Sequence, residues 1–327
     1  MLPLLLILDD REGLIRSSSC WKELEQLVDR EFLDGTIEGA DPATLARAQF
    51  LMAIRERTAL NETVFARMPN LKLVLQTGGH AYHIDTVAAK ARGILIALGR
   101  RVRAPLDSVP ELTFALALGL MHKVPLGNFA IRNGEWPLLT GRTLANRRLG
   151  ILGLGRHGSR VAHIASAAFN MDVVAWDRGN SSANPTPPAS FASPAIKRVP
   201  LDELLATSDV VSIHLRLSKE STGLINKERL ALMRPDAILI NTARGAIVDE
   251  AALAEALQNG KLAGAGLDVF VEEPLPASSS LRKLRNVILT PHIGWTVEEV
   301  FEEFARIACT QLAQFLEGRL DGSELLS

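Results

Sequence analysis

The feature that most constrains the fold is a glycine-rich turn between an apolar strand and a helix. Residues 148–152 predict a buried strand. Directly after it come Gly153, Gly155 and Gly158, in the spacing Gly-x-Gly-x-x-Gly, and a predicted helix runs on to Phe169. In this context the glycines form a tight turn, admit a pyrophosphate and let the helix pack closely on the strand. The stretch therefore predicts a dinucleotide-binding unit of an α/β fold.

The next predicted strand, residues 172–176, ends at the carboxylate of Asp177. An acidic side chain about 20 residues after the glycines accepts hydrogen bonds from the adenosine ribose and repels a 2′-phosphate. Asp177 thus favours NAD over NADP. The adjacent Arg178 complicates the choice, because a guanidinium there can bind a 2′-phosphate, cover the adenine or face solvent.

Strand-like and helix-like stretches alternate along the rest of the chain, which predicts parallel sheets. Before the glycine turn, strands are expected at 4–8, 49–54, 71–75 and 93–96, and helices at 21–30, 61–68 and 85–92. After it, strands are expected at 209–213, 237–241, 264–269 and 287–289, and helices at 201–207, 227–233, 249–259 and 297–316. A long apolar helix is predicted at 109–121, with Pro110 in its first turn, packed between domains or subunits. Trp136 is expected to pack within a turn at 133–137.

Two domains are favoured by the length of 327 residues. The basic run 100–103 indicates a crossing into a second domain, and the helix at 297–316 can return the chain to the first. The sequence therefore predicts one domain from residues 1–98 with 295–327, and a dinucleotide-binding domain at 99–294. Residues 179–200, rich in Ser, Pro and Ala, predict an extended surface loop.

Composition argues against several classes of partner and compartment. The net charge of −1 gives no field to attract nucleic acid or an anionic membrane, and no segment is long and apolar enough to span a bilayer. The apolar opening at 2–8 lacks a basic start and predicts a strand rather than a signal peptide. Cys20 and Cys309 form neither a disulfide framework nor a metal-ligand cluster. They indicate buried or free thiols in a reducing cytoplasm, with no metal site.

Three polar side chains follow predicted strands in the second half of the chain. Arg244 lies on the turn Asn241–Asp249, and Glu273 and His292 come after later strands. Ligands bind at this edge of open α/β sheets. There a fixed cation can hold a carboxylate or polarise a carbonyl, and a histidine can donate a proton. Each residue alone would be ordinary on a surface or in a core, but together they predict a site that acts on a small acid.

A second glycine loop, at 77–80, precedes these motifs. Gly78 and Gly79 let the backbone approach a ligand, and exposed N–H groups there can bind a carboxylate. The alternative is a plain strand-to-helix turn, in which His80 is a structural histidine.

The order and spacing of these motifs resemble the D-isomer-specific 2-hydroxyacid dehydrogenases, over about residues 71 to 300. The resemblance rests on the glycine turn and Asp177, and on the stretches 241–249, 268–270, 273–274 and 291–294. It implies two Rossmann-like domains with doubly wound parallel sheets, the nucleotide-binding domain being inserted into the substrate domain. It also implies hydride transfer between NAD(H) and a 2-keto or D-2-hydroxy acid, by a homodimer.

The resemblance implies a role for each site residue. Arg244 would bind the substrate carboxylate and carbonyl oxygen, His292 would be the general acid, and Glu273 would orient His292 and favour its protonated form. Amides of Gly78, Gly79 and His80 would hold the substrate carboxylate. The cofactor would be bound by Gly153, Gly155, Arg156, His157, Gly158, Asp177, Arg178, His214, Leu215, Arg216, Thr242, Ala243, Asp268 and Gly294. Of these, Arg156 and His157 would lie beside the pyrophosphate, and residues 214–216 beside the adenine. Asp268 would hold the nicotinamide carboxamide.

The chain departs from the family pattern at a few positions. His80 stands where many members have glycine, Arg216 replaces a common proline, and Trp295 replaces a more usual small residue. The 179–200 loop is longer than usual. A non-enzymatic NAD(H)-dependent binding protein of the same fold is the alternative, but no partner-binding tail is visible in the sequence.

Overall fold

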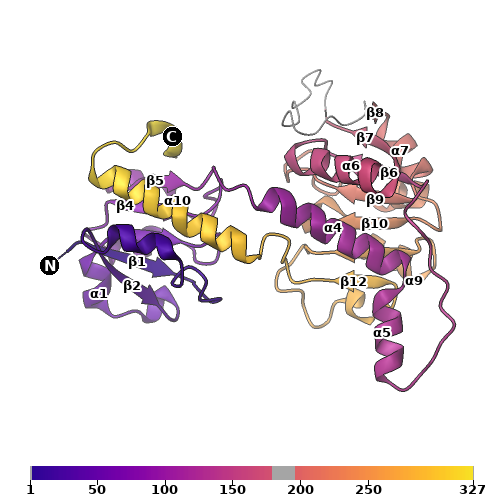
Figure 1. Cartoon of the computed structure of the whole chain (residues 1–327), viewed down its shortest axis with the longest axis horizontal. Coiled ribbons are helices and arrows are strands. Elements are labelled where there is room, and N and C mark those ends of the chain that lie inside the picture. Colours follow the sequence, from indigo (N-terminus) through magenta and orange to yellow (C-terminus); the bar gives the residue numbers. More distant parts are fainter. Residues whose placement is uncertain (1, 179–195, 327) are drawn as a thin grey trace. The chain divides into compact units, whose positions relative to one another are not determined.

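The computed structural model describes residues 2–178 and 196–326, and it divides into two compact units. Unit 1 comprises Met1–Ala104 with Val297–Ser327, and unit 2 comprises Pro105–Thr296 (Figure 1). Each unit holds a sheet whose paired strands are all parallel. The predicted α/β class with two parallel sheets is therefore confirmed.

The unit boundaries lie a few residues beyond the predicted crossings at 98/99 and 294/295. Hydrogen bonds explain the first difference. The backbone N–H groups of Arg103 and Ala104 donate to the Glu303 carboxylate at 2.6 and 3.0 Å, and Arg100 donates to the Ser323 carbonyl. These bonds tie the basic connector to unit 1. The substrate-binding and dinucleotide-binding roles of the two units remain predictions.

Unit 1 is built on a five-stranded sheet in the order β2-β1-β3-β4-β5. Its strands are β1 (Leu4–Leu8), β2 (Asp29–Leu33), β3 (Ala48–Ala53), β4 (Leu73–Gln76) and β5 (Leu95–Leu98). Its helices are α1 (Pro42–Arg47), α2 (Glu62–Ala66), α3 (Thr86–Ala91), α10 (Glu298–Leu316) and the 3-10 turns η1 (Ser19–Leu24), η2 (Ile37–Gly39) and η5 (Gly322–Glu324). Phe50 of β3 meets Phe315 of α10 edge-on at 5.9 Å, so the C-terminal helix is part of this core.

The prediction of a helix at 21–30 was wrong. This stretch forms the short 3-10 turn η1 and then β2, which pairs with β1 at the sheet edge. The buried side chains of Trp21 and Leu24 had suggested a helical period, but the Trp21 indole donates to the Ile15 carbonyl at 2.7 Å and fixes a tighter turn. The helix predicted from Asn61 is confirmed as α2, because the Asn61 side chain accepts from the Val64 N–H.

Unit 2 is built on a seven-stranded sheet in the order β12-β11-β10-β9-β6-β7-β8. Its strands are β6 (Arg148–Leu152), β7 (Asp172–Trp176), β8 (Lys197–Arg198), β9 (Val210–Ile213), β10 (Ile238–Asn241), β11 (Gly264–Leu267) and β12 (Val287–Leu289). Its helices are α4 (Pro105–Met121), α5 (Val124–Arg132), α6 (Arg156–Phe169), α7 (Leu201–Thr207), α8 (Lys227–Leu232), α9 (Glu250–Gln258) and the 3-10 turns η3 (Gly245–Ile247) and η4 (Ser280–Lys283). One apolar core joins the sheet to α4 and α6, and another joins it to α7, α8 and α9.

The long apolar helix α4 packs on the sheet of its own unit (Figure 1). Its predicted packing between domains or subunits remains a prediction. A Cβ at Gly266 of β11 would stand 2.8 Å from the Leu116 Cβ, so this glycine lets the helix approach the strand. The helix also begins earlier than predicted, and Pro110 lies in its interior instead of its first turn. Among the described residues, no single helix is long and apolar enough to cross a membrane. Taken together, α4 and α5 have the length and composition of a membrane span, but the pair is bent by 63°.

The predicted surface loop at 179–200 lies mostly outside the described residues. Its last part is not a loop, because residues 197–198 form β8 beside β7, and the Val199 N–H donates to the Ala175 carbonyl at 3.0 Å. The expected packing of Trp136 was also wrong, since this side chain is 87% exposed.

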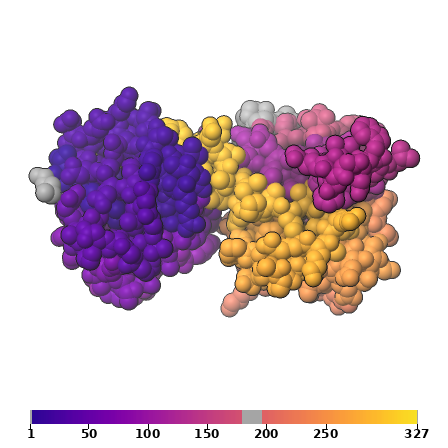
Figure 2. All heavy atoms as spheres, turned by 90° about the horizontal axis from the view of Figure 1, so that it is seen from below, coloured from indigo at the N-terminus to yellow at the C-terminus, as the bar shows by residue number. Residues whose placement is uncertain are grey.

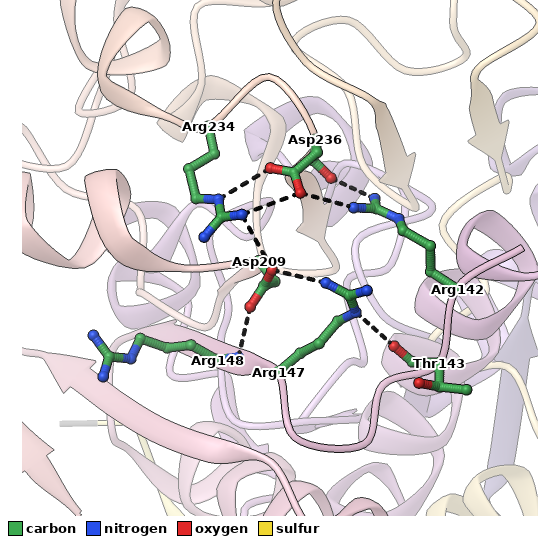
Figure 3. A network of polar contacts seen from close by, with 7 residues as sticks. All are labelled: Arg142, Thr143, Arg147, Arg148, Asp209, Arg234 and Asp236. Atoms are coloured by element: carbon green, nitrogen blue, oxygen red, sulfur yellow. Dashed lines mark hydrogen bonds and ion pairs between the residues drawn. The ribbon is translucent and has the colours of Figure 1, made fainter.

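A network of charged side chains joins strands of unit 2 at their N-terminal ends (Figure 3). The Asp209 carboxylate, just before β9, accepts from the Arg147 guanidinium and from the Arg148 N–H at 3.1 and 2.8 Å. Asp236, just before β10, pairs with Arg142 and Arg234. These bonds satisfy polar groups at the edge of the sheet opposite to the strand ends that carry the candidate site.

Candidate active site

The glycine turn after β6 has the backbone geometry that its sequence predicts. Gly153 has a φ of 97°, a conformation that favours glycine. A Cβ at Gly158 would stand 2.0 Å from the Gly153 carbonyl oxygen, so only glycine lets α6 begin this close to β6. A Cβ at Gly155, in contrast, would meet no atom within 4 Å. Open space over this N-cap of α6 fits the pyrophosphate of a dinucleotide at a helix N-terminus.

Asp177 lies at the end of β7 and is tied to the glycine turn. Its Oδ1 accepts from the Leu154 N–H at 2.6 Å, and its Oδ2 lies 3.3 Å from the Arg198 guanidinium of β8. Arg178 is held elsewhere, by Ser218 and by Glu220, whose carboxylate lies 3.2 Å away. The cation next to Asp177 is thus Arg198, which the sequence analysis did not identify.

A pocket of about 490 Å³ opens beside the glycine turn. It is lined by Gly153, Gly155, Asp177, Arg178, His214, Leu215, Arg216 and Glu220. Seven of these eight residues belong to the set that the sequence assigned to a cofactor, and they come from loops after β6, β7 and β9. Glu220 was missed, because a lone glutamate on a surface turn carries no sequence signal.

Two histidines near this pocket are held in the neutral form. Burial lowers the pKa of His214 to about 3, and its Nε2 lies 2.8 Å from the Ser212 hydroxyl. Burial and the charge of Arg156 also lower the pKa of His157. The buried Nδ1 of His157 has no partner among the described residues. A neutral imidazole next to the start of α6 can donate one N–H to a phosphate oxygen.

The Arg244 turn is held by its own side chains and by the next strand loop. The Asn241 side chain donates to the Arg244 carbonyl and accepts from the Ala243 N–H, both at 3.0 Å. A Cβ at Gly245 would stand 2.0 Å from the Phe270 carbonyl carbon. The turn therefore fits against the loop that carries Glu273. Thr242 lies beside Thr113 of α4, with 3.2 Å between the hydroxyl oxygens.

Asp268 holds the loop that carries His292. Its Oδ1 accepts from the Thr290 hydroxyl and the Ile293 N–H, at 2.6 and 2.8 Å, and its Oδ2 accepts from the Gly294 N–H at 2.9 Å. The side chain is buried, which raises its pKa, while these hydrogen bonds act in the opposite direction. Its main visible role is to position this loop. The predicted contact with a nicotinamide remains a prediction.

His292 and Glu273 form a direct pair at the end of two strand loops. The His292 Nδ1 lies 2.7 Å from the Glu273 Oε2, and the Glu273 Oε1 accepts from the Phe270 N–H at 2.9 Å. His292 has a φ of 57°, which is uncommon for a side chain of this size. Backbone strain of this kind concentrates at functional sites, where the surroundings enforce it.

Electrostatics joins Arg244 to this pair. Burial opposes ionisation of Glu273, but hydrogen bonds from His292 and Phe270 and the charges of His292 and Arg244 lower its pKa below the ordinary value. Glu273 is therefore an anion at neutral pH and keeps a hydrogen bond with one ring nitrogen of His292. The structure thus brings together the three residues that the sequence proposed as catalytic.

The glycine loop at 77–80 follows β4 in unit 1 and has a further cation beside it. Gly78 has a φ of 89°, and a Cβ there would stand 2.5 Å from the Arg55 Nη1. The Arg55 N–H donates to the Thr77 hydroxyl at 2.7 Å, which fixes the two loops together. His80 stacks on Tyr82 at 5.1 Å between ring centroids. Arg55 was missed because nothing in the sequence relates it to a loop more than twenty residues away.

Comparison with known proteins places the chain in a family. Residues 114–294 match the model of the family described as D-isomer specific 2-hydroxyacid dehydrogenase, NAD binding domain. This range contains the glycine turn, the pocket and the three candidate catalytic residues. NAD is therefore the cofactor of the domain, and the open space over Gly155 fits it.

Comparisons over most of the chain extend the similarity to both units. The chain is 36% identical over 303 residues to D-3-phosphoglycerate dehydrogenase of Mycobacterium bovis, covering 91% of this chain and 54% of that protein, so it spans about half the length of that relative. It is 36% identical over 289 residues to glyoxylate reductase of Thermofilum pendens, covering 84% and 83%. The crystal structure of D-lactate dehydrogenase from Aquifex aeolicus with NAD and lactic acid is similar with a TM-score of 0.77 and 28% identity, covering 99% and 98%. The chain belongs to the D-isomer specific 2-hydroxyacid dehydrogenase family.

Proposed function

We propose that the protein transfers a hydride between NAD(H) and C2 of a 2-keto acid, which interconverts it with the D-2-hydroxy acid. The observation that carries this proposal is the His292–Glu273 hydrogen bond, together with the positive charge of Arg244 that acts on Glu273. A histidine with one nitrogen held by a carboxylate can give a proton to a carbonyl oxygen through the other nitrogen. NAD(H) supplies the hydride, and the chain supplies position and charge.

The chain's own residues have distinct tasks in this proposal. Arg244 binds the substrate carboxylate and carbonyl oxygen, and His292 gives or takes the proton. Glu273 holds the Nδ1 side of His292 and leaves Nε2 for the substrate. The amides of Gly78, Gly79 and His80 bind a substrate carboxylate. Asp268, with Thr242, Ala243 and Gly294, serves the nicotinamide end.

The activity is tested by following NADH oxidation with a panel of acids. Glyoxylate, hydroxypyruvate, pyruvate, phenylpyruvate and branched-chain 2-keto acids cover the small, polar, aromatic and aliphatic side chains. Turnover with at least one of them supports the proposal. Binding of NADH without turnover of any 2-keto acid would contradict it and favour a non-catalytic NAD-binding protein.

Arg55 leads to a prediction about the substrate. The Arg55 guanidinium beside the Gly78 loop suits an acid with a second anionic group, as in the substrate that names the D-3-phosphoglycerate dehydrogenases. We expect Arg55→Gln to raise KM for D-3-phosphoglycerate by about 10- to 100-fold, because a hydrogen bond to a charged group is worth roughly 1.5–3 kcal/mol. KM for glyoxylate should change much less.

The matched control for this variant is Arg92→Gln, which removes an arginine of the same unit that pairs with Glu62 on the surface. It should leave both KM values unchanged. An equal rise of KM for the two substrates in Arg55→Gln would contradict a role of Arg55 in binding the second anionic group.

Glu220 leads to a prediction about the choice of cofactor. Its carboxylate lies 3.2 Å from the Arg178 guanidinium and holds it at the rim of the pocket. Glu220→Gln removes this ion pair and leaves Arg178 its hydrogen bond to Ser218. Arg178 can then meet a 2′-phosphate more easily, and the affinity for NADPH should rise by up to about fivefold, the range of an exposed ion pair. Affinity for NADH should not change. Both are measured by titration of coenzyme fluorescence.

Glu255→Gln is the control for charge, since it breaks the exposed pair with Lys227 away from the pocket. If NADPH affinity rises equally in this variant, or does not rise with Glu220→Gln, Glu220 does not set the cofactor preference.

The exposed apolar surface around α5 indicates self-association. Phe129, Ile131, Trp136 and Leu138 are 59%, 52%, 87% and 98% exposed. This segment stands out from the rest of unit 2 in both views (Figures 1 and 2). A second copy of the chain would remove this apolar area from water. We expect light scattering to give the mass of a dimer, and Trp136→Asp to shift it toward the monomer; a monomeric wild type would contradict this.

A further inference from the structure

The two cysteines of the chain meet inside unit 1. Cys20 lies in η1 and Cys309 in α10, 289 residues apart in sequence, yet their sulfur atoms are 2.7 Å apart. A covalent S–S bond is about 2.05 Å long. Both side chains are buried, and both are free thiols. The sequence alone indicated buried or free thiols without a disulfide framework, because nothing in it relates these two positions.

The pairing is built into the fold. η1 is anchored by the Trp21 indole bond to the Ile15 carbonyl and by the Ser18 side chain, which accepts from the Cys20 N–H. Cys309 lies in the middle of a 19-residue helix whose inner face is buried. A disulfide therefore needs only a small approach of two side chains on fixed backbones.

A metal site does not explain the pair. Zinc sites with thiolates need four ligands, or three with an open position. No group of three or more His, Cys, Asp or Glu side chains suited to a metal ion occurs among residues 2–178 and 196–326. Two thiols in contact, without further ligands, are suited to oxidation instead.

We propose that Cys20 and Cys309 are a redox modification site, at which a peroxide converts the thiol pair into a reversible intramolecular disulfide. The disulfide would fasten the two chain segments from which unit 1 is assembled, residues 1–104 and 297–327.

The two sulfur atoms differ in a way that gives the reaction an order. The hydrogen bond from Cys309 lowers the pKa of the Cys20 thiol, against the effect of burial, and the same contact raises the pKa of Cys309. Cys20 is also the more exposed, at 9% against 2%. The Cys20 thiolate is therefore the first nucleophile.

The reaction balances in two steps. The Cys20 thiolate attacks one oxygen of hydrogen peroxide, the O–O bond breaks, and a sulfenic acid and hydroxide form; the hydroxide takes up the thiol proton as water. The Cys309 sulfur then attacks the Cys20 sulfur, the S–O bond breaks, and the leaving hydroxide takes the Cys309 proton. Two thiols lose two electrons and two protons, and the peroxide becomes two waters.

The experiment uses the reduced full-length protein treated with a small excess of hydrogen peroxide. We expect titratable thiols, measured after denaturation, to fall from two to none. Mass spectrometry of the digest should show the Cys20 and Cys309 peptides joined with the loss of two hydrogens. Because the closed loop is long, Tm should rise by about 5–10 °C and return after dithiothreitol.

Cys20→Ser and Cys309→Ala are the control variants, and neither should gain stability from peroxide. Since the wild-type measurements stand alone, they remain decisive even if a variant folds poorly. The proposal is overturned if the wild-type thiols stay titratable, if they become sulfinic or sulfonic acids without a link, if the link joins two chains, or if Tm does not rise.

Discussion

Replacing His292 by glutamine should lower the rate of 2-keto acid reduction by about 10²–10⁴-fold, the contribution of a positioned general acid. The structure gives the reason: His292 has one ring nitrogen fixed by Glu273 and is held in a strained backbone by the Asp268 hydrogen bonds. A glutamine amide cannot supply the proton. Binding of NADH, measured separately by fluorescence, should stay within a few-fold of the wild type.

A second variant takes account of the positive φ of His292. Asparagine tolerates a positive φ better than most side chains, so His292→Asn keeps the loop at lower cost than glutamine while also removing the acid. We expect both variants to lose activity equally. Near-normal turnover in either one, with the same cofactor affinity, would show that His292 is not the proton donor.

Arg244→Ala should reduce kcat/KM by about 10²–10³-fold, the loss seen when one donor to a developing oxyanion is removed. Within residues 2–178 and 196–326, the Arg244 side chain donates a hydrogen bond to the Ala243 carbonyl. The Asn241 side chain holds the turn independently, through the Arg244 carbonyl and the Ala243 N–H. The turn should therefore survive the substitution. NADH affinity should remain nearly intact, and Tm should fall little.

Two comparisons separate charge from shape at this position. Arg244→Lys keeps the cation but loses the planar fork that binds a carboxylate at two points, and we expect it to recover only part of the activity. Arg229→Ala, which removes an arginine paired with Asp202 in the same unit, should change nothing. A parallel loss of NADH binding and activity in Arg244→Ala would contradict a substrate-binding role.

The parts of the molecule that sequence predicted best depend on short-range patterns. The strand at 148–152, the glycine turn and the helix to Phe169 appear in the structure at the expected residues, because apolar runs and glycines with required φ values act locally. The helices begun by Asn61, Asp85 and Asp249 follow for the same reason, since each side chain caps its own helix.

The parts that sequence missed depend on contacts between distant segments. β2 is a half-buried edge strand of mixed polarity, which carries no clear period. Three contacts arise only when the chain folds and brings distant positions together. They join Arg55 to Gly78, Arg198 to Asp177 and Cys20 to Cys309. Trp136 was expected to pack within its turn, whereas here it belongs to an exposed apolar surface. The cluster of Arg244, Glu273 and His292 could be predicted because all three follow parallel strands of one sheet, whose C-terminal ends share an edge.

The measurement that tests the central claim most directly is the fate of the nicotinamide hydride. NADH carrying deuterium at C4 of its reactive face is incubated with the protein and the panel of 2-keto acids, and the acids are analysed by mass spectrometry and chiral chromatography. Our account predicts a D-2-hydroxy acid that carries one deuterium at C2. A protein that binds NADH, yet yields no deuterated hydroxy acid from any member of the panel, would contradict it.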